Sequence, residues 1–96
     1  MPVPYSSSSI RLDRVGDVVT ASGIIAVTSN FSGITNQKVN ETVPDGFRPA
    51  SAGTILIAGN NGQLWNIRCN SDGECWLSGS AAIGYQYAVL GSWITV

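Results

Sequence analysis

Apolar and polar residues alternate along much of the chain, most regularly through residues 64–78, LWNIRCNSDGECWLS. Alternation at every second position is typical of a β-strand, because successive side chains point to opposite faces of a sheet. Ser71-Asp72-Gly73 interrupts the alternation with residues that favour tight turns. This stretch therefore predicts a β-hairpin whose strands carry two tryptophans, an arginine and both cysteines.

Several other segments have the length and β-branched composition of strands, and turn sequences separate them. The predicted strands are residues 10–14 and 18–27 as a first hairpin, then 38–43, 54–58, 85–90 and 92–96, the last two hinged at Gly91. Residues 28–37 and 79–84 are predicted connections, with Phe31 and Ile34 pointing inward, and turns are expected at 44–46 and 60–62. No segment keeps a helical period. We expect an all-β fold, a compact antiparallel β-barrel or sandwich of about eight short strands.

The turn at Ser71-Asp72-Gly73 also predicts which residues of the hairpin face each other. With a three-residue loop and Gly73 at positive φ, Cys69 faces Cys75 and Arg68 faces Trp76. This register predicts an apolar inner face formed by Trp65, Ile67, Cys69, Cys75 and Leu77. It predicts an outer face formed by Asn66, Arg68, Asn70, Glu74, Trp76 and Ser78.

The outer face has the residue types of a saccharide-binding surface. A tryptophan ring offers a stacking surface to the apolar face of a sugar or polyol, while arginine, asparagine and serine bond its hydroxyl groups. The candidate ligand-binding residues are Asn66, Arg68, Trp76, Ser78 and Tyr85. A structural explanation has equal weight: Arg68 over Trp76 is also a cross-strand cation–π pair worth about 0.5–1 kcal/mol, or part of a subunit interface.

Two further alternatives stay open from the sequence. Cys69 and Cys75 are compatible with a cross-strand disulfide in an oxidising compartment or with two buried thiols, and assembly in a cytoplasm favours the thiols. Tyr85, Tyr87 and Trp93 are compatible with core positions or with the wall of a groove, and alternation does not separate these alternatives.

The residue inventory argues against catalysis and metal binding. The chain has no histidine, the commonest general base and metal ligand, and its two cysteines cannot complete a tetrahedral zinc site. Only Asp72 and Glu74 among the carboxylates are close in sequence, at a turn where water keeps both ionised. We expect a binding module that is not an enzyme and uses no cofactor and no metal.

Composition and charge limit the class of partner. The chain has 96 residues, enough for one domain, of which 44% are hydrophobic and only 11% are charged. A net charge of -1 with scattered cations argues against nucleic acid, and no apolar run reaches the roughly 20 residues that cross a bilayer. Sparse charge favours apolar strands covered by other copies of the chain. Residues 1–9 are predicted as a linker or the end of an upstream region, and residues 10–96 as the domain.

Four motifs occur in order from about Ile10 onward: Gly16-Asp17-Val18-Val19, Val43-Pro44-Asp45-Gly46-Phe47-Arg48-Pro49, Gly73-Glu74-Cys75-Trp76 and Gly91-Ser92-Trp93-Ile94. In this order and spacing the chain resembles the C-terminal head domain of receptor-binding proteins on the baseplates of siphophages that infect lactic acid bacteria. The second motif also recurs in phage tail-fibre tips. The resemblance implies a homotrimeric β-barrel head at the virion tail tip, joined to an upstream baseplate or tail protein, that binds host cell-wall glycan near subunit boundaries.

The resemblance also implies where a saccharide would bind. In that family the aromatic hairpin contributes a histidine and an aspartate from one strand and a tryptophan from the next. Asn66 stands at the position of the histidine and Arg68 near that of the aspartate, while Trp76 lies within one place of the tryptophan. Arginine suits an anionic, phosphate-bearing glycan better than a carboxylate does. The expected function is adsorption to host saccharide; the alternative is a trimerising tip or baseplate spacer without a ligand.

Overall fold

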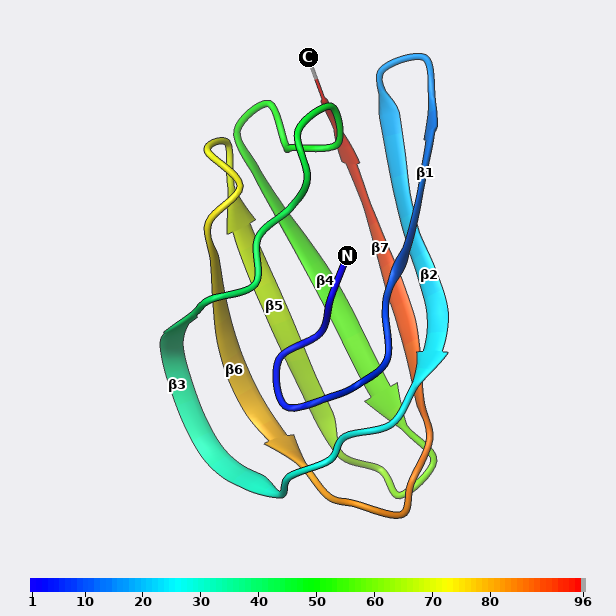
Figure 1. The fold of residues 1–96 in the computed structure, drawn as a ribbon, viewed down its shortest axis with the longest axis vertical. Coiled ribbons are helices and arrows are strands. Elements are labelled where there is room, and N and C mark those ends of the chain that lie inside the picture. Colours follow the sequence, from blue (N-terminus) through cyan, green and yellow to red (C-terminus); the bar gives the residue numbers. More distant parts are fainter. Residues whose placement is uncertain (96) are drawn as a thin grey trace.

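The computed structural model describes residues 1–95, which form one antiparallel sheet of seven strands and contain no helix (Figure 1). The strands are β1 (Arg11–Val15), β2 (Val18–Ile25), β3 (Phe31–Val39), β4 (Ala52–Gly59), β5 (Leu64–Asn70), β6 (Cys75–Ala81) and β7 (Tyr87–Ile94). Their order across the sheet is β1-β2-β7-β4-β5-β6-β3. The all-β prediction is confirmed, with seven strands instead of about eight.

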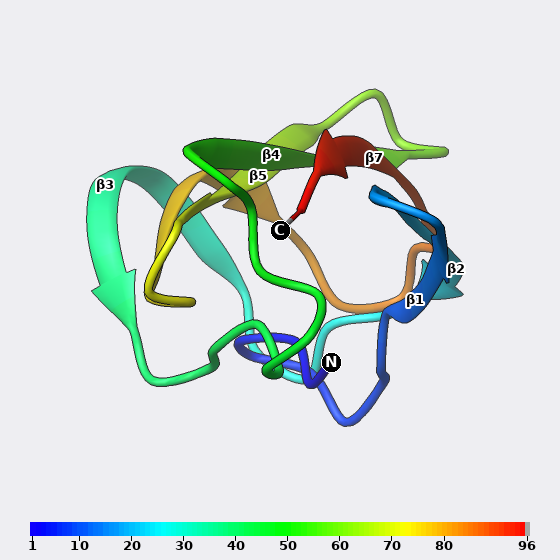
Figure 2. The ribbon, with the colours of Figure 1, turned by 90° about the horizontal axis from the view of Figure 1, so that it is seen from above.

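The sheet curls around its inner face but does not close, so the predicted barrel or sandwich is wrong (Figure 2). Closure would pair the edge strands β1 and β3, and no such pairing exists within residues 1–95. Irregular segments cover the open side instead, and Val3, Val43 and Pro49 from these segments are buried. Pro44 and Pro49 lie in the connection between β3 and β4, residues 40–51. Proline lacks the amide hydrogen that a central strand needs, so this connection covers the core without forming a strand.

Alternation along the central strands separates the core from the outer face. Ile55 and Ile57 on β4 are fully buried, as is Tyr87 on β7. Leu56 on β4 and Leu90 on β7 point outward, are paired with each other, and are 41% and 59% exposed. The curl therefore encloses a single apolar core, and no segment of residues 1–95 covers the outer face of the central strands.

β3 is the largest departure from the predicted elements. Residues 28–37 were expected to be a connection and residues 38–43 a strand, but the strand runs from Phe31 to Val39. β3 is an edge strand with an irregular register against β6, and an edge tolerates polar residues because one side of its backbone is unpaired. Phe31 and Ile34 pack against the core, as predicted.

The C-terminal segment forms one strand rather than two hinged at Gly91. β7 continues through Gly91 and pairs with both β2 and β4. A Cβ at Gly91 would lie 3.0 Å from the carbonyl oxygen of Thr54, so this glycine permits close strand approach. Pairing also extends β6 to Ala81, into the predicted loop at 79–84. Val96, the end of the predicted last strand, lies outside the described residues.

The first hairpin and both predicted turns are confirmed. β1 and β2 pair up to Val15 and Val18. The amide of Phe47 donates to the carbonyl oxygen of Pro44 at 3.2 Å, and the amide of Gly62 donates to that of Gly59 at 3.1 Å. Proline, asparagine, aspartate and glycine at these places therefore acted as local turn signals, as their backbone preferences predict.

Residues 1–9 pack against the sheet. Val3 and Pro4 are buried, and the amino group of Met1 donates a hydrogen bond to the carbonyl oxygen of Ile10 at 2.9 Å. Ser6 forms an isolated bridge with Val27. The segment thus contributes to the core. Its interpretation as a linker or the end of an upstream region, and the domain boundary at residue 10, stay predictions.

Candidate functional site

A tight turn sets the register of the β5–β6 hairpin. The amide of Gly73 donates to the carbonyl oxygen of Asn70 at 3.0 Å, and the amide of Glu74 donates to Asp72 Oδ1 at 3.0 Å. Gly73 has a φ of 88°, a conformation that glycine adopts without strain. The predicted register is confirmed, since Asn66 pairs with Ser78, Arg68 with Trp76 and Cys69 with Cys75.

The inner face of this hairpin is core, as the sequence predicts. Trp65, Ile67, Cys69, Cys75 and Leu77 are each at most 1% exposed. The Trp65 ring packs edge-on against Phe31 and Tyr87, with ring centroids 5.2 Å and 6.2 Å away. The indole Nε1 of Trp65 is buried and has no hydrogen-bond partner within residues 1–95. Apolar packing rather than hydrogen bonding therefore holds this ring.

The two cysteines on the inner face are free, buried and in contact. Their sulfur atoms lie 2.7 Å apart and share a hydrogen bond. The hydrogen bond with Cys75, together with burial, raises the pKa of the Cys69 thiol above its ordinary value, and the same hydrogen bond lowers the pKa of Cys75. The hydrogen bond between the two sulfur atoms therefore keeps the proton on Cys69.

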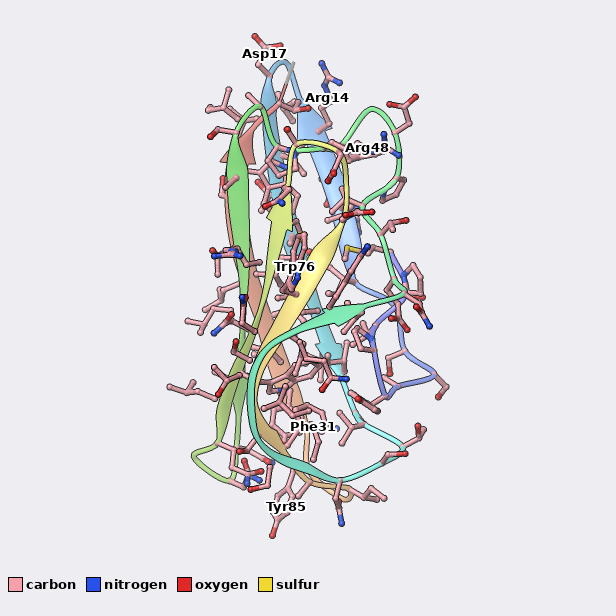
Figure 3. The ribbon with its side chains drawn as sticks, turned by 90° about the vertical axis from the view of Figure 1, so that its left-hand side faces the viewer. Arg14, Asp17, Phe31, Arg48, Trp76 and Tyr85 are labelled. Carbon is pink, nitrogen blue, oxygen red and sulfur yellow. The ribbon has the colours of Figure 1, made fainter. Side chains whose placement is uncertain are left out.

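The outer face brings Arg68 and Trp76 together. The guanidinium carbon of Arg68 lies 5.9 Å from the centroid of the Trp76 ring, within the range of a cation–π contact. Arg68 is exposed and Trp76 partly exposed, and Figure 3 shows Trp76 on the outward side of β6. Arg68 forms no ion pair within residues 1–95. Its charge is therefore not neutralised by a carboxylate of the described chain.

Asn66 and Ser78 are the next cross-strand pair on the same face after Arg68 and Trp76, and they differ in how free their side chains are to bind a ligand. The amide of Asn36 donates to the Ser78 hydroxyl oxygen at 2.8 Å, so Ser78 already accepts one hydrogen bond from β3. Asn66 is partly exposed and is flanked by Ser78 on β6 and Leu56 on β4. We call these four residues, Asn66, Arg68, Trp76 and Ser78, the Trp76 surface.

Tyr85 is not part of the Trp76 surface. It is 44% exposed in the connection between β6 and β7, and Figure 3 places it at the lower end of the molecule, away from Trp76. The other two aromatic residues left open by alternation are core. Tyr87 is buried and its hydroxyl donates to Gln63 Oε1 at 3.1 Å, while Trp93 Nε1 donates to the carbonyl oxygen of Phe47 at 2.7 Å.

Lys38 is a cation beside Trp76 that the sequence did not indicate. β3 pairs with β6 so that Lys38 and Trp76 are Cα partners, and Lys38 Nζ lies 3.1 Å from Glu74 Oε1. Trp76 is thus flanked by Arg68 on one side and Lys38 on the other. The alternation at residues 38–43 placed Lys38 on a strand, but only the long-range pairing of β3 with β6 places that strand here.

A surface hollow borders the far side of Lys38. It has a volume of about 190 Å³ and is lined by Pro4, Tyr5, Gln37, Lys38, Val39, Asn40 and Glu41. The hydroxyl of Tyr5 accepts a hydrogen bond from Gln37 Nε2 at 3.3 Å. Most of the side chains in this lining are polar, so the hollow is suited to a hydroxylated or charged ligand.

The described residues were also searched for metal sites and for membrane-spanning helices. Within residues 1–95 no three His, Cys, Asp or Glu side chains are grouped to hold a metal ion. The same residues contain no helix long and apolar enough to cross a membrane.

Comparisons with known proteins do not place the chain in a family. No protein-family model matches it. A search of curated proteins finds no match either. Its geometry and its sequence motifs therefore carry the functional argument alone.

Proposed function

We propose that the Trp76 surface binds a saccharide. The observation that carries this proposal is the Arg68–Trp76 pair, in which a partly exposed indole ring and an unneutralised guanidinium stand side by side on an outward face. An indole ring stacks on the apolar face of a sugar, and the neighbouring donors and acceptors select its hydroxyl groups.

The proposed ligand class is an anionic, phosphodiester-linked glycan. Arginine offers a planar fork of donors that matches a phosphate, and Lys38 adds a second cation on the other side of the ring. Lys38 is paired with Glu74, so Arg68 is the main anion-binding group. An exposed cation without a carboxylate partner gains more from a bound phosphate than one that must first break an ion pair.

The biological role that we propose is adsorption of a phage to the cell-wall polysaccharide of its host. The resemblance of the four sequence motifs to baseplate head domains supports this role, together with a homotrimeric state, a position at the tail tip and attachment to an upstream baseplate or tail protein. The domain binds without catalysis. Each copy would bind weakly, and display in many copies would convert later binding events into intramolecular ones.

Titration of host cell-wall polysaccharide onto the purified protein tests the saccharide proposal. Trp76→Ala should reduce binding about fivefold or more, because stacking of one sugar on an aromatic ring is worth about 1 kcal/mol or more. Tyr85→Ala is the matched control, since it removes an exposed aromatic residue away from the surface. Undiminished binding by Trp76→Ala, or an equal loss in both variants, would remove this surface from consideration.

A second proposal is a trimerising tip or spacer without a ligand. In this proposal the Trp76 surface is buried between subunits. The outer faces of β2, β7 and β4 favour it, because they lie on the same side of the sheet, carry no charged residue and would extend the contact. Iodide quenching of tryptophan fluorescence in the intact protein separates the proposals. Trp65 and Trp93 are only 1% and 6% exposed, so quenching reports mainly on Trp76. A quenchable Trp76 leaves the surface free for glycan, whereas protection indicates that another copy covers it.

A further inference from the structure

The polar hollow beside Lys38 lies where two irregular segments meet. Its lining comes from residues 4–5 of the amino-terminal segment and from residues 37–41 at the end of β3 (Figure 2). Its volume of about 190 Å³ is below the roughly 300–1,000 Å³ of sites for drug-sized ligands, so it suits one small ring. A neighbouring hollow of about 430 Å³, lined by Pro2, Asn40, Glu41, Thr42 and Pro44, shares two of these residues. Asn40 and Glu41 therefore border both hollows.

Tyr5 supplies the aromatic ring of the hollow. Its ring centroid lies 5.0 Å from that of Phe31, which packs against the core, yet Tyr5 is 37% exposed. Its φ of 57° is uncommon for a residue with a side chain. Thr28 holds this conformation, because its amide and its hydroxyl donate to the Tyr5 carbonyl oxygen at 2.7 Å and 3.1 Å. The ring is therefore fixed at the wall of the hollow.

The polar side chains of the hollow complement the hydroxyl groups of a sugar. The Tyr5 hydroxyl oxygen accepts a hydrogen bond from Gln37 Nε2 at 3.3 Å, which leaves the hydroxyl hydrogen to donate to a ligand. Asn40 is exposed and offers both a donor and an acceptor, while the Glu41 carboxylate accepts. Sugar hydroxyl groups both donate and accept, and the apolar face of a sugar ring stacks on an aromatic ring.

Charge distinguishes the hollow from the Trp76 surface. Glu41 is partly exposed and forms no ion pair within residues 1–95. Lys38 also lines the hollow, but its ammonium group lies 3.1 Å from Glu74 Oε1. The charge without a partner is therefore negative in the hollow and positive at Arg68 on the Trp76 surface. A negative charge repels a phosphate and attracts an ammonium group.

We propose that the hollow is a second saccharide site, which binds a single sugar residue without negative charge and binds an amino sugar most tightly. Tyr5 stacks on the sugar ring, and Asn40 bonds its hydroxyl groups. Glu41 accepts from a hydroxyl group or pairs with the ammonium group of an amino sugar. In this proposal the amino-terminal segment supplies a binding residue, Tyr5, in addition to its buried residues.

The hollow and the Trp76 surface adjoin at Lys38. This residue lines the hollow and is the Cα partner of Trp76. One polymer can therefore contact both, with a phosphate at Arg68 and a sugar residue without phosphate in the hollow. That extension to a single polymer rests on the saccharide proposal for the Trp76 surface, whereas binding of a lone sugar in the hollow does not.

Titration of three monosaccharides onto the full chain, followed by amide chemical shifts in NMR spectra, tests the second site. The probes are glucosamine, glucose and a glucose phosphate, which differ mainly in charge. Affinity should fall in that order, and the shift changes should centre on Tyr5, Gln37 and Asn40. Glu41→Gln keeps the shape of the side chain and removes its charge. It should weaken glucosamine binding about threefold and leave glucose binding nearly unchanged.

Three alanine variants locate the bound sugar. Tyr5→Ala should weaken binding of all three probes about fivefold or more, because it removes the stacking surface. Asn40→Ala, at an exposed residue, should also weaken binding and gives a second reading if Tyr5→Ala disturbs the packing of the amino-terminal segment. Trp76→Ala is the matched control, because it removes an aromatic ring outside the hollow and should not change monosaccharide binding there.

A preference for glucosamine that Glu41→Gln abolishes, with binding retained in Trp76→Ala, would support the proposal. It would be overturned if none of the probes shifted the amides of the hollow, or if all three bound equally well. Loss of monosaccharide binding in Trp76→Ala but not in Tyr5→Ala or Asn40→Ala would also overturn it, because the sugar would then occupy the Trp76 surface. Polysaccharide binding that Trp76→Ala leaves undiminished counts against the Trp76 surface alone, so the two proposals can fail separately.

Discussion

Trp65 and Trp76 lie on the two strands of one hairpin and have opposite surroundings. Trp65 is 1% exposed and packs edge-on against Phe31 and Tyr87, with no polar partner for its indole nitrogen within residues 1–95. Trp76 lies outside, beneath the guanidinium of Arg68. The turn at Gly73 pairs Arg68 with Trp76, so these two side chains lie on the same face of the hairpin. Trp65 is three residues from Arg68 on the same strand, and alternation therefore places it on the opposite, inner face. The same residue type therefore stabilises the core at one position and is available for recognition at the other.

Replacing each tryptophan by alanine should give the largest difference between the two faces. Trp65→Ala should lower the free energy of unfolding by about 3 kcal/mol or more, because it empties a core position. Trp76→Ala should lower it by about 1 kcal/mol or less, because its ring is partly exposed. Urea unfolding followed by circular dichroism measures both. Equal losses would show that Trp76 is a core residue and would break the comparison.

The inner face should also make the free energy of unfolding depend on pH, through the thiol of Cys69. The pKa of Cys69 is raised in the folded protein by its hydrogen bond with Cys75 and by burial. The unfolded thiol ionises near pH 8.5, so above that pH the unfolded state binds fewer protons and the folded state loses stability. Under reducing conditions the free energy of unfolding should therefore fall by about 1 kcal/mol per pH unit above about pH 8.5.

Cys69→Ala is the control for this pH dependence. The variant loses some packing, but its stability should no longer fall between about pH 8.5 and 9.5, a window below the ordinary pKa of tyrosine and lysine. A wild-type slope equal to that of Cys69→Ala would show that Cys69 does not account for the effect.

The smallest expected effect is the coupling between Arg68 and Trp76. A double-mutant cycle with Arg68→Met and Trp76→Ala should give an interaction free energy of about 0.5–1 kcal/mol, the range of an exposed cation–π contact. Glycan binding should fall much more than stability in Arg68→Met. A coupling energy of several kcal/mol would instead indicate that the Arg68–Trp76 pair stabilises the fold, as the inner face does.

Prediction from the sequence succeeded where the signal was local. Gly73, the asparagine-glycine pair at 61–62 and Pro44 set turns through their own backbone preferences, and alternation then assigned inner and outer positions on β5 and β6. Prediction failed where pairing between distant strands decided the result. Gly91 resembles a hinge in the sequence but allows close packing of β7 against β4. Residues 31–37 look like a loop but form the edge strand β3.

The candidate site divides in the same way. Asn66, Arg68, Trp76 and Ser78 were predicted together, because one turn and one alternation pattern define their common face. Lys38 could not be predicted, because it reaches Trp76 only through the β3–β6 pairing across a separation of 38 residues in sequence. Tyr85 was grouped with the site on residue type alone, and the structure places it elsewhere.

The amino-acid sequence by itself determined the turns, the first hairpin, and the inner and outer positions of β5 and β6, since these depend on alternation and on the conformations of single residues. Only the tertiary structure decided the order of the strands, the open curl of the sheet and the neighbours of each outward side chain. It set Leu56 beside Leu90 and Lys38 beside Trp76. These outcomes depend on contacts between segments far apart in the chain, and a local sequence pattern does not indicate which distant segments pair.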